Sequence, residues 1–325
     1  MFKTSLAGLV GALALAAAPF SAAQAQEFPS RTITLLVGTL PGGSADFMAR
    51  IAAEAMGKQL GTRVIVDNRP GANAAVATRA VARAPADGYT LLFNANNMAS
   101  NLAGMKEPGY VMSDFEVVGG VGYAPFIMMA NTSSSKARTL KEFVEYGKAN
   151  PGKLTYASLG PGSTPMLVAN RFNEVSKVGF REIPYKGASQ ALQDVLGGQV
   201  DVYFGLPSGA TAGIIKQPHM TAFAITGKTR SEQLPDVPTF AELGYPGVTD
   251  VSIGAVWIAA ATPKPIVQKL RKALADGLKD PKLQETLKGS GQSPYRGDPQ
   301  QFYKEMQAFE TLYRGDFKKL GLEPQ

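Results

Sequence analysis

The sequence predicts a two-lobed α/β fold, and three observations support this prediction. Short apolar segments rich in β-branched residues alternate with segments of helical periodicity, which is the order of a sheet covered by helices. The chain has 325 residues, of which 45% are hydrophobic, and this length exceeds what one hydrophobic core usually supports. Two strand-like segments, 126–130 and 255–260, bracket the middle of the chain and are placed to carry it between two lobes.

The first lobe begins with a strand–helix–strand–helix–strand order. Residues 32–37 form a β-branched apolar run that predicts a buried strand. Residues 45–60 then place apolar side chains at helical spacing, and Gly61 stands where a helix usually stops. The next elements along this segment are expected as a strand at 64–66, a helix at 73–83 and a strand at 89–93.

The same alternation resumes in the middle of the chain, and the C-terminal segment is helical. Two crossings between lobes make a hinge, and a hinge between two α/β lobes makes a cleft. We therefore expect one lobe at 26–127 plus 256–325 and a second at 128–255, each built on a mostly parallel sheet flanked by helices. The expected strands of the second lobe are 154–157, 181–184, 200–204 and 222–226, its helices are 140–148, 165–175 and 189–196, and the tail helices are 265–278, 281–288 and 299–319.

Residues 1–25 have the pattern of a secretory signal peptide. Lys3 provides a basic start, an apolar run follows, and Ala23-Gln24-Ala25 has the small-x-small pattern of a cleavage site before Gln26. The apolar run covers only about 13 residues, whereas a bilayer span needs about 20. The sequence therefore predicts a periplasmic protein released by cleavage near Ala25-Gln26, with an uncleaved N-terminal anchor as the alternative.

The composition excludes several classes of chemistry. The chain has no Cys and one His, so thiolate nucleophiles, Cys-ligated metals and multi-His metal sites are not expected. We expect neither a cofactor nor a metal. The formal net charge is +7, but Lys and Arg are scattered without a basic run, so no nucleic-acid partner is expected. This excess of basic over acidic residues is either ordinary surface charge or a means of weakly attracting anionic solutes.

Two glycine loops carry the functional signal. The first, Gly42-Gly43-Ser44 with Asp46, follows the first strand, and the second, Gly162-Ser163-Thr164, follows the strand at 154–157. Backbone N–H groups at a helix start favour an anion, and glycine allows close approach. One loop falls in each expected lobe, which indicates a small carboxylate held across the cleft. The alternative is that both loops are simple turns with Ser44, Asp46, Ser163 and Thr164 serving the helix starts.

A set of motifs spread over the chain carries a resemblance to a known family. The chain resembles the substrate-binding proteins of tripartite tricarboxylate transporters, the Bug family. The matching segments are Pro41-Gly42-Gly43 with Asp46, 66–72 (VDNRPGA), 84–92 (APADGYTLL), 151–154 (PGKL), 184–187 (PYKG), 196–201 (LGGQVD) and 234–239 (LPDVPT).

The resemblance implies a type II-like periplasmic binding protein fold without catalysis. Such a protein closes on a carboxylated solute, here a dicarboxylate or an aromatic carboxylate, and delivers it as a monomer to membrane permease subunits. Carried over by position, the residues of the two glycine loops hold the ligand through backbone N–H groups, hydroxyls and waters. The expected ligand-binding residues are Gly42, Gly43, Ser44, Asp46, Gly162, Ser163 and Thr164, with Asn94, Asn96 and Phe204 as further residues lining the cleft.

Two questions stay open at this level. Phe47 and Met166 stand beside the two loops where relatives differ, and either residue contacts the ligand or packs in the core. The second question is function. An exported hydrolase is the main alternative, although no Gly-x-Ser-x-Gly or Ser-x-x-Lys motif occurs in the chain. A ligand sensor that feeds a signalling kinase is the other.

Overall fold

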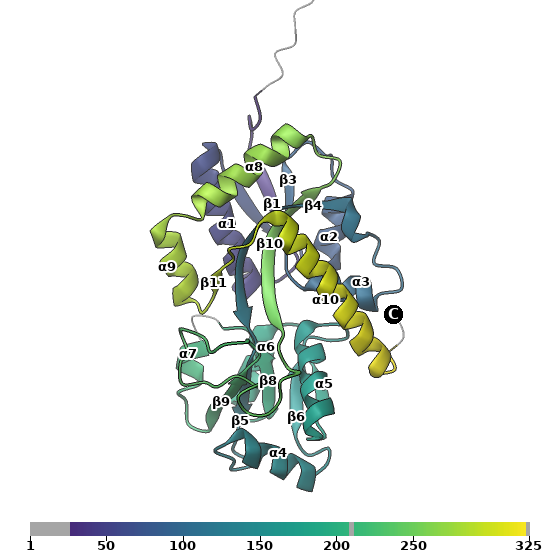
Figure 1. Ribbon diagram of the computed structural model, residues 1–325, viewed down its shortest axis with the longest axis vertical. Coiled ribbons are helices and arrows are strands. Elements are labelled where there is room, and N and C mark those ends of the chain that lie inside the picture. Colours follow the sequence, from purple (N-terminus) through teal and green to yellow (C-terminus); the bar gives the residue numbers. More distant parts are fainter. Residues whose placement is uncertain (1–26, 208–210, 323–325) are drawn as a thin grey trace, which may run out of the picture.

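Two β-sheets, one in each lobe, organise the chain in the computed structural model (Figure 1). The structure describes residues 27–207 and 211–322. The expected signal peptide at 1–25 lies outside the described residues. The two lobes are stacked along the long axis of the molecule, and the two-lobed α/β fold expected from the sequence is confirmed.

The sheet of lobe 1 has the strand order β11-β4-β10-β3-β1-β2. β1 pairs in parallel with β2 and β3, whereas β10 runs antiparallel to β3 and β4. The sheet is therefore mixed rather than mostly parallel, because the strands that lead to and from the other lobe run in opposite directions. Its strands are β1 (Ile33–Val37), β2 (Val64–Asn68), β3 (Thr90–Asn94), β4 (Phe115–Pro125), β10 (Val251–Ala259) and β11 (Ser293–Pro294).

Helices from both ends of the chain cover this sheet. The N-terminal half provides α1 (Ser44–Leu60), α2 (Ala75–Ala82), α3 (Asn97–Gly104) and the 3₁₀ helix η1 (Met112–Asp114). The C-terminal tail returns to the same lobe with α8 (Lys264–Gly277), α9 (Pro281–Gly289) and α10 (Pro299–Lys319). α1 and α8 pack against each other on one side of the sheet, and α10 packs against α3 on the other.

The sheet of lobe 2 has the order β7-β6-β8-β5-β9 and is also mixed. β6 pairs in parallel with β7 and β8, and β5 runs antiparallel to β8 and β9. Its strands are β5 (Ile127–Asn131), β6 (Thr155–Ser158), β7 (Arg181–Pro184), β8 (Val202–Gly205) and β9 (Met220–Ile225), and its helices are α4 (Leu140–Ala149), α5 (Thr164–Ser176), α6 (Ala188–Leu196) and α7 (Thr211–Ile214).

The two passages between the lobes lie side by side. Phe126 separates β4 from β5, and its N–H and C=O both bond to Thr226, 2.9 Å in each case. The Thr226 hydroxyl in turn bonds to the backbone of Asp250, directly before β10. Residues 251–255 pair with β3 and β4 in lobe 1, so the return passage lies earlier than the boundary at 255 expected from the sequence.

Several local features depart from the expected elements, among them the short elements η1, α7 and β11, which were not expected. β4 was not expected because Gly119, Gly120 and Gly122 interrupt its apolar pattern. α3 was not expected because its sequence, NMASNLAG, lacks a clear apolar face. α2 begins at Ala75 rather than at residue 73, because residues 72–74 are all left-handed, with φ of 46°, 50° and 70°.

Helix α10 joins the lobes. In Figure 1 it descends from lobe 1 to lie beside α5 of lobe 2. Met166 and Leu167 of α5 are buried in the same hydrophobic cluster as Tyr313 and Phe317 of α10. Hydrophobic packing therefore continues across the lobe junction on this side.

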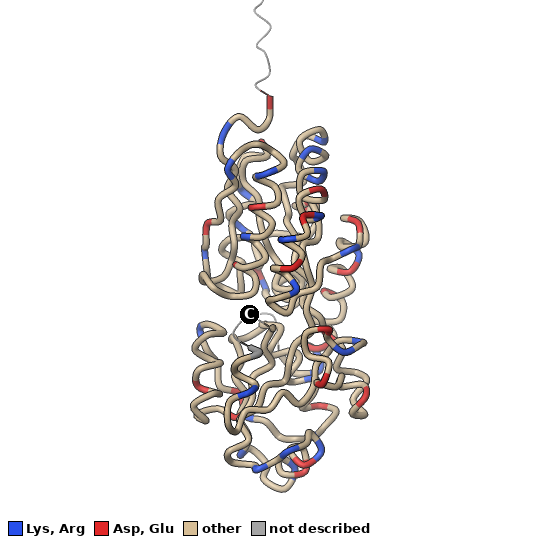
Figure 2. Tube along the Cα trace, turned by 90° about the vertical axis from the view of Figure 1, so that its left-hand side faces the viewer, with Lys and Arg blue, Asp and Glu red and all other residues tan. Residues whose placement is uncertain are grey.

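The surface shows no segregation of charge between the lobes. Basic and acidic residues are interspersed along both lobes in Figure 2, and many form exposed ion pairs such as Lys58–Glu54. Within the described ranges, no helix combines the length and apolar character needed to cross a membrane.

Candidate ligand-binding site

The first glycine loop connects β1 to α1 and leaves the start of that helix open. Gly42 has φ of +87°, a conformation that favours glycine. Gly43 is the N-cap residue and provides no side-chain cap, and the first helical bond runs from the Phe47 N–H to the Gly43 carbonyl at 2.9 Å. The N–H groups of the first turn thus have no intrahelical acceptor.

Asp46 organises this loop. Its carboxylate accepts hydrogen bonds from the Gly42 N–H at 3.0 Å, from Arg50 at 2.9 and 3.0 Å, and from Asn68 at 2.9 Å. Burial opposes ionisation of Asp46, but these bonds outweigh burial and hold its pKa below the ordinary value. Asp46 was expected to line the ligand site. Its oxygens are occupied by the protein, so its contribution is to hold the loop in place.

The second glycine loop connects β6 to α5. Gly160 and Gly162 have φ of +87° and +76°, and Ser163 is the N-cap residue without a side-chain cap. Pro165 follows in the first turn and has no N–H group. Ser163 and Thr164 are both buried; the Ser163 hydroxyl accepts the Leu159 N–H at 3.3 Å, so it also stabilises the loop.

Each of the two loops lies at the junction of the lobes and contacts a residue of the opposite lobe. On the side of the second loop, Asn73 Nδ2 from lobe 1 donates to the Gly162 carbonyl at 3.3 Å. On the side of the first loop, Leu40 lies against Gly187, the N-cap of α6 in lobe 2. The structure therefore brings the expected residues Gly42, Gly43, Ser44, Gly162, Ser163 and Thr164 to the lobe junction, together with the uncapped starts of α1 from lobe 1 and of α5 and α6 from lobe 2.

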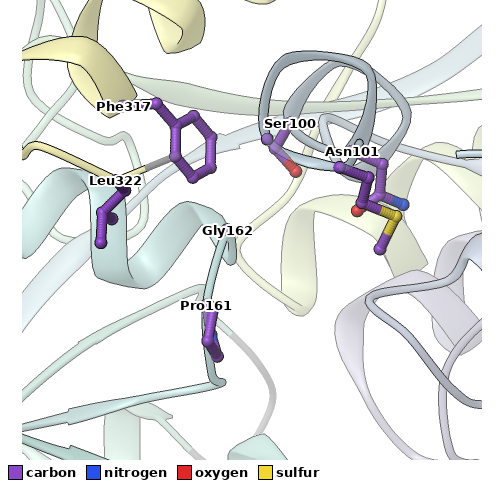
Figure 3. Close-up of a pocket in the computed structure, with 8 residues that line it drawn as sticks. Ser100, Asn101, Pro161, Gly162, Phe317 and Leu322 are labelled. Atoms are coloured by element: carbon purple, nitrogen blue, oxygen red, sulfur yellow. The ribbon is translucent and has the colours of Figure 1, made fainter. Parts of the chain in front are cut away.

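A small pocket opens beside the second loop (Figure 3). Ser100 and Asn101 of α3 lie on one side of it, Pro161 and Gly162 on the other, with Phe317 and Leu322 beside them. The Ser100 and Asn101 side chains already bond to Asn73. The pocket does not include the first loop. We therefore place the candidate site at the two helix starts, where backbone N–H groups lack intrahelical acceptors, rather than in this pocket.

Asn94, Asn96 and Phe204 were expected to line the cleft, and the structure places them inside the lobes. Asn94 donates to the Thr78 hydroxyl at 2.9 Å and accepts the Ala95 N–H at 2.7 Å. Asn96 bonds to the backbone of Val251 and Ile253 and to the Tyr313 hydroxyl. Phe204 is fully buried between the rings of Phe172 and Phe240. All three are buried and bond or pack within the described part of the fold, so their contacts stabilise it.

Phe47 and Met166, which the sequence left open, both pack in hydrophobic clusters. Phe47 is half-buried against the α1–α8 cluster of lobe 1. Met166 is buried among residues of α3 and α10, although it belongs to α5 of lobe 2. Met166 therefore joins the lobes by apolar contact.

Sequence reasoning missed two groups of residues at the junction. Asn73 and Gln292 each bond to both lobes, but neither lies in a motif, and no sequence signal marks them. The other group is a buried ionic cluster in which Arg171 of α5 bonds to Asp250 beside the hinge and to Asp316 of α10. Burial and the nearby Asp316 raise the pKa of Asp250, against the effect of Arg171.

The buried charge of this cluster is balanced only in part. Two carboxylates share one guanidinium, and Asp250 Oδ1 has no hydrogen-bond partner among the described residues. The cluster joins the helix that carries the second loop to the hinge and to the tail. It therefore connects the candidate site to the part of the chain on which the lobes would turn.

Residues 48–316 match the family model of the tripartite tricarboxylate transporter family receptor, TctC. The structure of the periplasmic binding protein BugD is 34% identical, with a TM-score of 0.83 over 92% of this chain and 100% of that chain.

Two further solved structures contain carboxylates. MatC from Rhodopseudomonas palustris, solved with bound malate, is 27% identical with a TM-score of 0.81 over 89% of this chain and 99% of that one. A second R. palustris protein, solved with adipate, is 27% identical with a TM-score of 0.84, covering 92% of this chain and 100% of the other.

Proposed function

Because the chain belongs to the tripartite tricarboxylate transporter receptor family, we propose that it captures a small carboxylate between its lobes and delivers it to membrane permease subunits. The protein acts in the periplasm, where its solved relative BugD is described as a binding protein. It works as a monomer and without converting its ligand. Dicarboxylates are the preferred class, with aromatic carboxylates next.

The observation that carries this proposal is the pair of uncapped helix starts. α1 and α5 begin at the carboxyl ends of β1 and β6, the edge at which open α/β sheets bind ligands. An anion at a helix start gains about 0.3–1 kcal/mol from the helix dipole, and each hydrogen bond to a charged group contributes about 1.5–3 kcal/mol. Two such starts, one from each lobe, suit a ligand with a carboxylate at either end.

The choice of dicarboxylates has two supports. Malate and adipate, which occupy two related structures, each carry two carboxylates. In this chain Arg50, which follows the first loop, is already paired with Asp46, so N–H groups and hydroxyls are the donors that the first loop offers. Such a site recognises a carboxylate by several moderate hydrogen bonds.

A thermal-shift screen tests the proposal directly. A ligand at 100 times its Kd stabilises the folded state by about 2.7 kcal/mol, which raises the Tm by several degrees. We expect malate, adipate or a related dicarboxylate to do so, and mass spectrometry to recover the acid unchanged. Absence of a shift across mono- and dicarboxylates, or conversion of the bound acid, would contradict the proposal.

A matched pair of glycine substitutions then locates the site. Gly43 has φ of −80°, and an added Cβ would lie 3.8 Å from its nearest neighbour. Gly43→Ala should therefore fold normally and lose affinity, because the methyl group stands where a carboxylate must approach. Gly315→Ala on α10, where an added Cβ meets nothing within 4 Å, is the control and should bind normally. Equal affinity in both variants would remove the first loop from the site.

Delivery is tested in cells. Uptake of the radiolabelled acid should require both this protein and the permease subunits, and Gly43→Ala should slow it. Unchanged uptake in a strain that lacks the protein would contradict the transport role while leaving ligand binding intact.

A further inference from the structure

We propose that Gln292 is a positioning residue that turns the Ser44 hydroxyl into a hydrogen-bond donor for the ligand carboxylate. The inference rests on the proposed function and extends it to a residue of the C-terminal tail. Gln292 lies between α9 and β11 in lobe 1, and its side chain bonds to the first glycine loop and to lobe 2.

Gln292 is held firmly at the lobe junction. It is only 1% exposed, and its backbone N–H donates to the Leu287 carbonyl at 3.0 Å. The preceding residue, Gly291, has φ of +81°, and a Cβ there would lie 2.4 Å from Cβ of Pro207 in lobe 2. The tail therefore approaches lobe 2 as closely as glycine permits and places the Gln292 side chain beside it.

The chemistry of Pro207 fixes the orientation of the Gln292 amide. Nε2 of Gln292 lies 3.1 Å from the Pro207 carbonyl oxygen and 3.0 Å from Ser44 Oγ. A carbonyl can only accept a hydrogen bond, so the amide must present its nitrogen to Pro207. The same nitrogen then donates its second hydrogen to Ser44.

This arrangement determines what Ser44 can do. Because Ser44 Oγ accepts from Gln292, its own proton is left to donate to a further acceptor. Ser44 is the first residue of α1 and is half-buried, next to the open N–H groups of that helix. A carboxylate at the helix start provides the acceptor, so the hydroxyl adds a directed donor to the backbone N–H groups.

The fold alone does not account for Gln292. Its Oε1 is buried and has no hydrogen-bond partner among the described residues, which normally costs about 1–3 kcal/mol. A glutamine that served only to join the lobes would be better placed with both amide atoms bonded. The position is explained if the nitrogen must meet both Ser44 and Pro207.

A double-mutant cycle for binding tests the proposal. The probes are malate and adipate, titrated by calorimetry into the wild type, Ser44→Ala, Gln292→Leu and the double variant. We expect each single variant to lose about tenfold in affinity, and the double variant to lose no more than the larger single loss, because both act through one hydroxyl. The stability of the unliganded protein is measured in the same four proteins, because the Gln292–Ser44 bond is present without ligand and its loss is shared there too. A merely structural role would give this coupling in stability alone and leave the affinity of all four proteins similar.

Two further variants sharpen the result. Gln292→Glu should bind more weakly than Gln292→Leu, because a carboxylate would accept the Ser44 proton and repel the ligand. Gln284→Leu removes another amide–carbonyl bond of the tail, from Gln284 to Leu278, which does not involve Ser44, and should bind like the wild type.

The outcomes separate the two claims. A wild-type protein that binds neither acid refutes the proposed function and this inference with it. A wild type that binds, with losses that multiply to about a hundredfold in the double variant, refutes the role of Gln292 alone. So does a Gln292→Glu variant that binds as well as the wild type.

Discussion

Replacing Asp46 by Asn distinguishes a residue that holds the loop from one that touches the ligand. The Asp46 side chain is only 4% exposed and receives hydrogen bonds from Gly42, Arg50 and Asn68. An asparagine keeps the shape but presents an NH2 group on one side. One of the donors that now bond to the carboxylate must then face another donor.

The expected cost follows from these contacts. Leaving one buried donor without an acceptor costs about 1–3 kcal/mol. The ion pair adds little, because Arg50 is 53% exposed and exposed pairs contribute less than about 1 kcal/mol. We therefore expect Asp46→Asn to lower the free energy of unfolding by about 2 kcal/mol without ligand, and to weaken binding as the Gly42 N–H loses its anchor.

The pH dependence provides an independent check. Because the folded-state pKa of Asp46 lies below its ordinary value, its stabilising effect is fully present above the ordinary aspartate pKa of about 3.9. It is lost as the pH falls through the lowered folded-state value. Urea unfolding should therefore show a constant difference between wild type and variant from about pH 7 to pH 5, which narrows below about pH 4.

The matched control is Asp67→Asn, which removes an exposed pair with Arg69 and should cost less than about 1 kcal/mol. An Asp46→Asn variant as stable as the wild type, with a large loss of affinity, would refute the reasoning. That result would show that Asp46 meets the ligand directly.

Two other predictions concern the lobe junction. Arg171→Met leaves two buried carboxylates without their cation and should lower the free energy of unfolding by about 3–5 kcal/mol, measured in urea. Asp316→Asn keeps the Arg171–Asp250 pair and should lower it clearly less. Equal losses in the two variants would contradict the shared-cation arrangement. Gly38→Ala places a Cβ 2.2 Å from that of Ala74, so it should destabilise the fold by about 1–3 kcal/mol. It should also weaken ligand binding, because Asn73 is displaced together with Ala74. A variant with the wild-type Tm would contradict this, because it would show that the turn relaxes without cost.

The sequence predicts the scaffold of the site better than its contacts. α1 and α5 were found because their apolar residues repeat at helical spacing, and the two loops because glycines directly precede them. Phe204 was expected to line the cleft because it lies at the end of a strand, the edge at which ligands bind. The sequence does not show which face of the sheet its side chain lies on, and in the structure it packs against rings such as that of Phe172. The role of Gln292 could not be predicted from the sequence. Its partner Ser44 is 248 residues away, and a contact over that separation produces no repeating residue pattern.

The contacts on the two sides of the lobe junction differ in strength, and this difference bears on how the site opens. On the α5–α10 side, Met166 packs in the cluster of lobe 1 and Arg171 lies between two buried carboxylates. Breaking a buried ionic contact costs about 3–5 kcal/mol. On the α9–β11 side, the Gln292–Pro207 hydrogen bond and the close approach of Gly291 join the lobes.

A single neutral hydrogen bond contributes only about 0.5–1.5 kcal/mol net, so the α9–β11 side separates at lower cost. The bonds at the hinge also favour separation on the α9–β11 side. Phe126, Thr226 and Asp250 are hydrogen-bonded to one another in sequence, and Arg171 of α5 pairs with Asp250, so the hinge is attached to the α5–α10 side. The lobes are then expected to turn about the α5–α10 side and to part where Ser44 and Gln292 lie. We therefore expect the ligand to enter on the side of the first loop. The second loop, which α5 attaches to the hinge, is expected to stay in place while the first loop closes over the ligand.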